Sequence, residues 1–157
     1  MQKTIEFLFE LMRMPSVMGK ERSANRSIHK KMQNYYDDAD NPRSLILDAH
    51  TDVAPPSKVQ INPCNPGIIN GTIFSCGACD DTGQIAIIYL LPRTLFALKL
   101  RSYVDFVVEE ENGGSGTLSM VRLRAKADAT LVLESREYFL FENNRSIIRE
   151  EKYEIFY

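Results

Sequence analysis

Histidine is scarce in this chain of 157 residues, which contains only His29 and His50. A metal site in this chain would therefore need mostly oxygen ligands, or a sulfur ligand, to complete its coordination. The three cysteines, Cys64, Cys76 and Cys79, are an odd number. No secretory segment is apparent at the amino terminus, so they are expected to be reduced thiols in a cytoplasmic protein.

The sequence also lacks a long apolar run and an excess of either charge. The longest apolar stretch, residues 85–100, is interrupted by Pro92, Arg93 and Lys99, so no membrane partner is expected. The 19 basic and 21 acidic residues give a net charge of −2, which argues against a nucleic-acid partner. The hydrophobic content of 44% is ordinary for a globular protein.

Helix-like and strand-like segments alternate along the chain. Apolar residues at helical spacing predict helices over residues 2–13 and 20–36 and a third from Gly83, which Pro92 should kink or end before a second helical stretch to residue 100. Extended apolar runs predict strands at 44–49, 103–108 and 129–133, a short extended piece at 72–74 and an extended tail over 139–157. Residues 53–70 read as a long loop, and 117–124 as a short helix. This order favours an α/β fold with a mainly parallel sheet flanked by helices.

Each of the three main predicted strands ends at a residue type that binds metals. His50 and Asp52 follow the first strand, Glu109 to Glu111 follow the second, and Glu134 follows the third. Between the first two strands, Asp80 and Asp81 precede a predicted helix. Because ligands of open α/β sheets sit outside the carboxyl ends of the strands, these side chains are expected to lie within reach of one another.

Each motif also has a simpler interpretation when it is taken alone. Asp52 could cap a turn, and Asp80 and Asp81 could stabilise a helix amino terminus through its dipole. The run 109–111 could be solvated charge, although three adjacent carboxylates would gain from a nearby cation. Glu134 could pair with Arg136. The set on one edge of the sheet is much more informative than any single member.

The pair Cys76 and Cys79 allows a different class of function. A Cys-x-x-Cys segment before a helix is also the arrangement of thiol–disulfide oxidoreductases, in which the helix terminus lowers the thiol pKa. Asp80 and Asp81 work against this, because adjacent anions disfavour a thiolate. A structural zinc site would need a second ligand pair, which Cys64 alone does not supply.

Taken together, the motifs resemble the metallopeptidase family of acetylornithine deacetylase, succinyl-diaminopimelate desuccinylase and the carboxypeptidase G type enzymes. The resemblance spans roughly residues 5–136. It rests on His50-Thr51-Asp52, Gly77-Ala78-x-Asp80-Asp81-x-Gly83, Glu110-Glu111-Asn112-Gly113 and Glu134, with the opening Met14-Pro15-Ser16-Val17-Met18-Gly19-Lys20-Glu21. It implies a zinc-exopeptidase-like (phosphorylase/hydrolase-like) catalytic domain.

The resemblance also implies a role for each site residue. Asp80 would bridge two Zn²⁺ ions, for which Co²⁺ or Mn²⁺ could substitute; His50 and Glu134 would complete one site, and Glu111 would bind the other metal. Glu110 would be the general base, and Asp52 would orient His50. The implied reaction is hydrolysis of an amide bond in an N-acyl amino acid or a small peptide.

The chain departs from the family pattern in several places. No histidine follows His50, although the family uses a final histidine ligand, and Cys76, Thr82 and Ser135 replace an arginine, a lysine and a proline. We therefore interpret residues 1–137 as the amino-terminal part of an incomplete catalytic domain, and 138–157 as a tail toward an absent lid or dimerisation domain. The expected activity is a weakened metal-dependent amidohydrolase; the alternative is an inactive remnant that serves as a metal-binding or interaction module. Exposed sheet edges also predict self-association.

Overall fold

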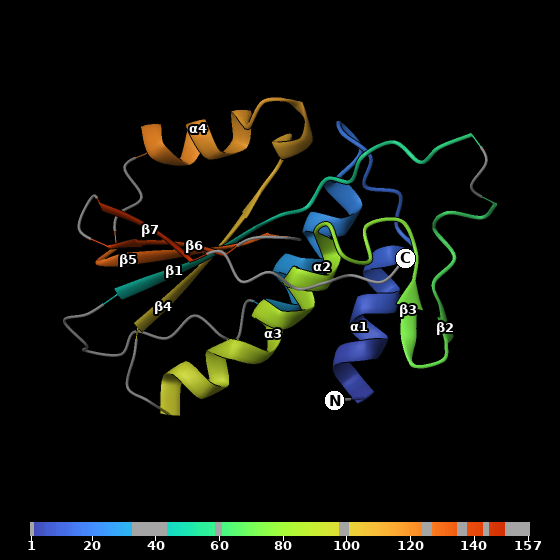
Figure 1. The fold of residues 1–157 in the computed structure, drawn as a ribbon, viewed down its shortest axis with the longest axis horizontal. Coiled ribbons are helices and arrows are strands. Elements are labelled where there is room, and N and C mark those ends of the chain that lie inside the picture. The colour runs from blue at the N-terminus through green and yellow to red at the C-terminus, as the bar shows by residue number, and fades with distance from the viewer. Residues whose placement is uncertain are drawn as a thin grey trace.

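The computed structural model describes residues 2–32, 44–58, 61–97, 101–123, 127–134, 138–142 and 145–149. Helices and strands alternate in this part of the chain as the sequence predicts (Figure 1). The elements are α1 (Gln2–Met12), α2 (Arg22–Met32), β1 (Ser44–His50), β2 (Gly67–Ile69), β3 (Thr72–Phe74), α3 (Thr82–Ala97), β4 (Arg101–Val107), the 3₁₀ turn η1 (Glu110–Asn112), α4 (Ser115–Arg122), β5 (Ala129–Leu133), β6 (Tyr138–Glu142) and β7 (Arg145–Arg149).

The main sheet has five described strands in the order β4-β1-β5-β6-β7. β1 lies between β4 and β5 and pairs with both in parallel, so the carboxyl ends of all three strands meet at one edge. The predicted parallel sheet flanked by helices is thus confirmed. The predicted site residues other than Asp80 lie at or just after the ends of its three parallel strands, β4, β1 and β5. β6 and β7 extend it as an antiparallel hairpin.

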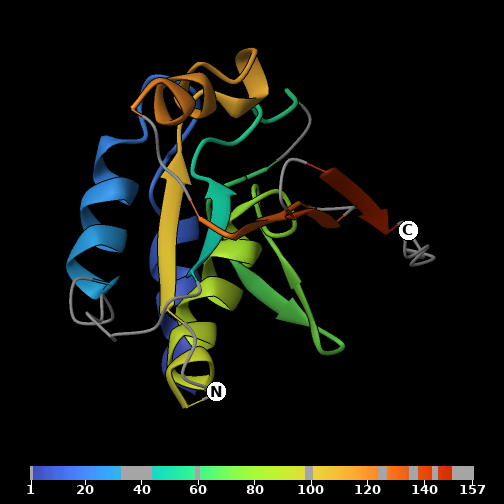
Figure 2. The same ribbon diagram turned by 90° about the vertical axis from the view of Figure 1, so that its left-hand side faces the viewer.

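Three helices cover one face of the sheet with apolar side chains. The buried core joins Phe7 and Leu11 of α1, Ile28 of α2, Ile88 of α3 and Leu47 of β1. α4 lies on the other side of the sheet from α3, at the top of Figure 1. Figure 2 shows that α4 passes over the ends of the strands. This packing holds β1 in the middle of the sheet, and the residues at its carboxyl end are buried.

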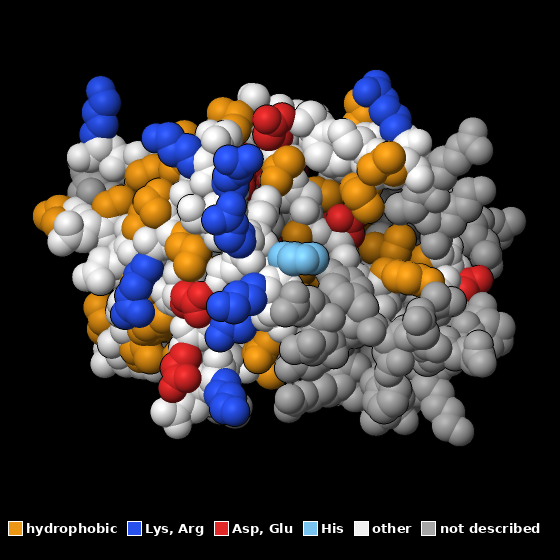
Figure 3. Space-filling view, turned by 180° about the vertical axis from the view of Figure 1, so that it is seen from behind, with side chains coloured by type: hydrophobic (Ala, Val, Ile, Leu, Met, Phe, Trp, Pro, Cys, Tyr) orange, Lys and Arg blue, Asp and Glu red, His pale blue; other side chains and the backbone are white. Residues whose placement is uncertain are grey.

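α2 shows why its sequence forms a helix at this place. Its buried residues, Ala24, Ile28 and Met32, fall every four positions and face the core. The exposed positions of the helix carry Arg22, Arg26, Lys30 and Lys31, and Figure 3 shows a band of Lys and Arg side chains across the back of the molecule.

Several sequence-based boundaries were wrong. The helix expected from Gly83 does not end at Pro92: α3 continues to Ala97, in agreement with the helical stretch expected beyond the proline, and residues 98–100 lie outside the described part. The expected loop over 53–70 contains β2, which pairs antiparallel with β3. α4 begins at Ser115, two residues before the expected start. The remainder of the predicted helix to residue 36 and the alternation at 153–157 lie outside the described residues.

The two edges of the described sheet are β4 and β7. Self-association through an exposed edge stays a prediction, as does the division of the chain at residue 137. Within the described residues, no helix combines the length and the apolarity that a bilayer span requires.

Candidate metal centre

His50 is the last residue of β1, and its ring is almost completely buried at 2% exposure. The Nδ1 atom lies 2.9 Å from the carbonyl oxygen of Asp52. Since a carbonyl oxygen can only accept a hydrogen bond, this contact places a proton on Nδ1. The other ring nitrogen, Nε2, is therefore the atom that can bind a metal.

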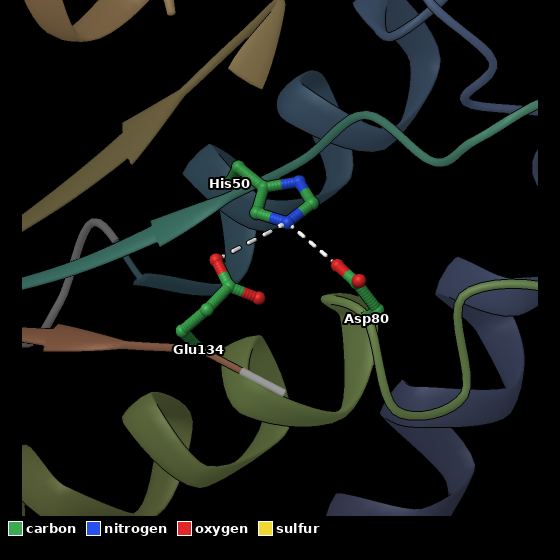
Figure 4. A group of neighbouring side chains, drawn as sticks. All are labelled: His50, Asp80 and Glu134. Carbon is green, nitrogen blue, oxygen red and sulfur yellow. Dashed lines mark hydrogen bonds and ion pairs between the residues drawn. The ribbon is translucent and has the colours of Figure 1, made fainter. Parts of the chain in front are cut away.

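Two carboxylates face Nε2 from neighbouring elements (Figure 4). Asp80, just before α3, places Oδ1 at 2.8 Å from Nε2, and Glu134, just after β5, places Oε2 at 3.7 Å. One donor atom from each of the three residues lies within 4.8 Å of the others. The sheet order explains this convergence, because β1 and β5 are adjacent parallel strands that end at the same edge.

The donor set fits a zinc ion. In a tetrahedral site with ligand distances of about 2.0–2.1 Å, two ligand atoms are about 3.3–3.5 Å apart. The measured separations of 2.8 and 3.7 Å bracket this value, so small side-chain movements would admit the ion. Imidazole nitrogen and carboxylate oxygen are both zinc ligands, and three protein ligands leave a fourth position for water, as catalytic zinc sites do.

Glu110 lies beside this group, on η1. Its Oε2 is 4.0 Å from Nε2 of His50, and 45% of its side chain is exposed. Burial raises the pKa of Glu110, and the charges of Glu134 and Glu111 raise it further, while His50 lowers it. A carboxylate with a raised pKa near a metal site is a suitable proton acceptor.

Glu111 lies outside the group of three. It lines a separate cavity of about 440 Å³ together with Asp80, Cys76 and Cys79. Asp80 lines this cavity and also a second cavity that contains His50 and Glu134; its role as a bridging ligand stays a prediction. The structure brings Glu111 to the same cavity wall as Asp80, and its binding of a second metal stays a prediction.

Asp52 makes contacts that the sequence did not indicate. It is completely buried, and its carboxylate oxygens accept the backbone N–H groups of Glu110 at 3.2 Å and Glu111 at 3.1 Å. Its Oδ1 is 3.5 Å from Nδ1 of His50, farther than its own carbonyl oxygen. The Asp52 side chain therefore holds the turn that carries Glu110, and its backbone carbonyl oxygen holds the imidazole ring of His50 through Nδ1.

Asp81 also has a role that the sequence did not reveal. Its place in the sequence indicated a stabilising role at a helix amino terminus, but its buried Oδ2 accepts the backbone N–H of His50 at 3.0 Å. Gln84, one turn later on α3, donates to the backbone oxygen of Glu134 at 3.4 Å. The spacing i, i+3 at the start of an apolar helix is the signal that could have placed both side chains on one face.

The electrostatics of the group reflect crowded carboxylates around one imidazole. Burial lowers the pKa of His50, but hydrogen bonds to Asp80 and Glu134 raise it to about 11. Burial raises the pKa of Asp81 to about 8, with a further contribution from Glu134. A divalent cation would replace the proton on Nε2 and relieve this repulsion.

Cys76 has the opposite character from a redox-active thiol. Burial raises the pKa of Cys76, and the neighbouring Cys64 raises it further. Cys64 and Cys76 are half-buried, and Cys79 is exposed. A raised thiol pKa lowers the population of reactive thiolate, which weakens the oxidoreductase interpretation.

The fold and the site together define an α/β protein with a candidate divalent-metal centre at the carboxyl ends of parallel strands. Residues 46–144 match Peptidase family M20/M25/M40, and the chain belongs to that family. No curated protein matches it in sequence.

Solved structures of metallopeptidases share this fold at low sequence identity. Aminopeptidase PepT of Bacillus cereus superposes with a TM-score of 0.67 at 20% identity, covering 85% of this chain and 43% of that one. The metallo-carboxypeptidase Sso-CP2 of Sulfolobus solfataricus gives 0.68 at 17% identity, over 84% of this chain and 37% of that one. The dipeptidase Dug1p of Saccharomyces cerevisiae gives 0.69 at 14% identity, over 85% and 38%. The chain thus spans about two fifths of the length of these structures.

Proposed function

We propose that this chain binds a zinc ion through His50, Asp80 and Glu134 and takes part in hydrolysis of amide bonds in small peptides or N-acyl amino acids. The observation that carries the proposal is the convergence of three donor atoms within 4.8 Å at the end of β1. Family membership supports it, and the structural neighbours include an aminopeptidase and a dipeptidase.

The chain's own residues would divide the work around the metal. When bound, the zinc would polarise the amide carbonyl and lower the pKa of a bound water. Glu110 would accept the proton of that water and deliver it to the leaving nitrogen. Asp52 would hold Glu110 and the His50 ring in place through the contacts described above. Glu111 and Asp80 would hold a second ion, with fewer ligands from this chain than the first.

A zinc titration by calorimetry tests the binding step. The unmodified chain is expected to bind one zinc ion tightly and a second much more weakly, if at all. His50→Ala should remove the tight site, because it takes away the only nitrogen ligand of the group. Two equally tight ions in the unmodified chain, or unchanged tight binding in His50→Ala, would contradict the assignment.

A pair of glutamate variants tests the catalytic step. Glu110→Gln should keep zinc binding and lower any amide hydrolysis by roughly 10²–10⁴-fold, the usual contribution of a general base. Glu109→Gln is the matched control, because the Glu109 carboxylate accepts the Ser115 hydroxyl and does not face the metal group. Activity that survives Glu110→Gln would not originate at this site.

A metal-binding module without catalysis is the second candidate function. It is favoured by one sequence observation: the only histidine besides His50 is His29, on the exposed side of α2. Tight zinc binding without measurable hydrolysis of dipeptides or N-acyl amino acids would select this function over the first.

A further inference from the structure

Asp48 is a buried acid that neither the metal centre nor the family resemblance uses. It lies in β1 two residues before His50, so both side chains project from the same face of the sheet. The two positions are separated by about 6.6 Å along the strand, because a strand rises by about 3.3 Å per residue.

The carboxylate of Asp48 is poorly satisfied in its surroundings. The residue is only 9% exposed, and its Oδ1 has no hydrogen-bond partner among the described residues. Its register neighbours on the adjoining strands are Asp105 of β4 and Val132 of β5, and neither side chain carries a positive charge. The backbone N–H of Ala49 is a partner of this carboxylate, but a buried carboxylate with one unsatisfied oxygen is still costly, which makes this position a place where a donor from a ligand would be stabilised.

A cavity of about 570 Å³ connects Asp48 with the metal centre. Its lining includes Asp48, His50, Asp80, Glu110 and Glu134, and its remaining walls are mainly apolar. The described lining contains no lysine or arginine that could neutralise these acids. Asp105, the register neighbour of Asp48 on β4, does not line this cavity.

We propose that Asp48 is a specificity-determining residue that binds a protonated primary amine of the substrate whose amide carbonyl lies at the metal. This inference rests on the proposed function and names its substrate class: small amides that carry a cationic amino group close to the scissile bond. An acidic acyl group, such as a succinyl group, would be repelled from the same cavity.

Two hydroxamates of equal size provide the test. β-Alanine hydroxamate carries an ammonium group two carbons from a metal-binding carbonyl, a reach of about 6–7 Å once a hydrogen bond of about 2.8 Å is added. Butyrohydroxamate replaces that ammonium by a methyl group. Calorimetry on the zinc-loaded chain is expected to show at least about tenfold tighter binding of the amine, as for one hydrogen bond between charged partners.

Asp48→Asn should abolish this preference and leave the affinity for butyrohydroxamate unchanged, which also shows that the variant is folded and holds its metal. Asp105→Asn is the matched control and should keep the preference. Equal binding of the two hydroxamates by the unmodified chain would overturn the inference, as would a preference that survives Asp48→Asn or is lost equally in Asp105→Asn. If neither hydroxamate binds, the proposed metal function fails, and the role of Asp48 fails with it.

Discussion

Replacing Asp52 by asparagine tests how the site is held together. The Asp52 carboxylate accepts two backbone N–H groups, of Glu110 and Glu111, while its side chain is completely buried. Asparagine offers one acceptor oxygen and one NH₂ group, so one of the two backbone donors would face another donor. Hydrogen bonds to charged groups contribute about 1.5–3 kcal/mol, and an unsatisfied buried group costs about 1–3 kcal/mol. We therefore expect Asp52→Asn to lower the free energy of unfolding by about 3 kcal/mol.

The same change should weaken the metal site. The turn that carries Glu110 would lose its anchor, and the ring of His50 would lose a carboxylate at 3.5 Å. Groups that orient a metal ligand typically contribute about 10–100-fold to metal affinity. Urea denaturation of the metal-free chain and calorimetric zinc titration measure the two effects separately.

Asp128→Asn is the matched control for this prediction. Its carboxylate also accepts a backbone N–H, that of Ser44 at 2.6 Å, but it is exposed and lies at the opposite end of β1. It should cost less than about 1 kcal/mol and leave zinc affinity unchanged, because water can replace an exposed acceptor. A stability loss for Asp52→Asn no larger than that of Asp128→Asn, with unchanged zinc affinity, would refute the reasoning.

Three further predictions concern packing, pH and metal. Gly83→Ala should destabilise the protein in urea by about 2 kcal/mol, because an added Cβ would lie 2.4 Å from the Ala78 carbonyl oxygen; Gly67→Ala meets no atom within 4 Å and should be nearly neutral. The pKa of His50 is raised from 6.5 to about 11, so protonation of His50 stabilises the folded protein. This contribution to the free energy of unfolding is complete below pH 6.5 and is lost as the pH rises toward 11. Urea titrations of metal-free protein should show this decline, at up to about 1.4 kcal/mol per pH unit; a stability that rises with pH over this range would be inconsistent with it. Saturating zinc should raise the melting temperature and flatten the decline, and a melting temperature that scanning calorimetry finds indifferent to zinc would exclude tight binding.

The strands that carry the site could be predicted from the sequence because their apolar runs are long and end abruptly in acids or histidine. Leu47 and Leu133 belong to the buried core, as the apolar character of their strands indicates. The site residues His50 and Glu134 lie at the carboxyl ends of these strands. β2 escaped prediction because three residues among prolines have no periodicity to recognise. A helical stretch on both sides of Pro92 could be predicted from its apolar residues, but the sequence left open whether the proline would kink the helix or end it; the helix continues to Ala97.

The contacts between site residues could not be predicted in the same way. Sequence order shows that Asp52, Asp81 and Gln84 lie near the strand ends, but it does not show which backbone groups they accept from or donate to. The bond from Glu110 N–H to Asp52 joins residues 58 positions apart. Only the parallel pairing of β1 with β4, which brings their ends together, makes this bond available.

The balance of charge at the end of β1 gives the strongest reason to regard the group as a metal centre. Asp80, Glu110 and Glu134 all approach a single imidazole nitrogen within 4.0 Å. One proton on His50 can neutralise only one of these carboxylates, and the pKa of Glu110 is raised while that of His50 rises to about 11. A structural hydrogen bond between histidine and one aspartate would not require the others, and their mutual repulsion would oppose folding. A divalent cation would offset two of these negative charges, which is more than the single proton on His50 can do.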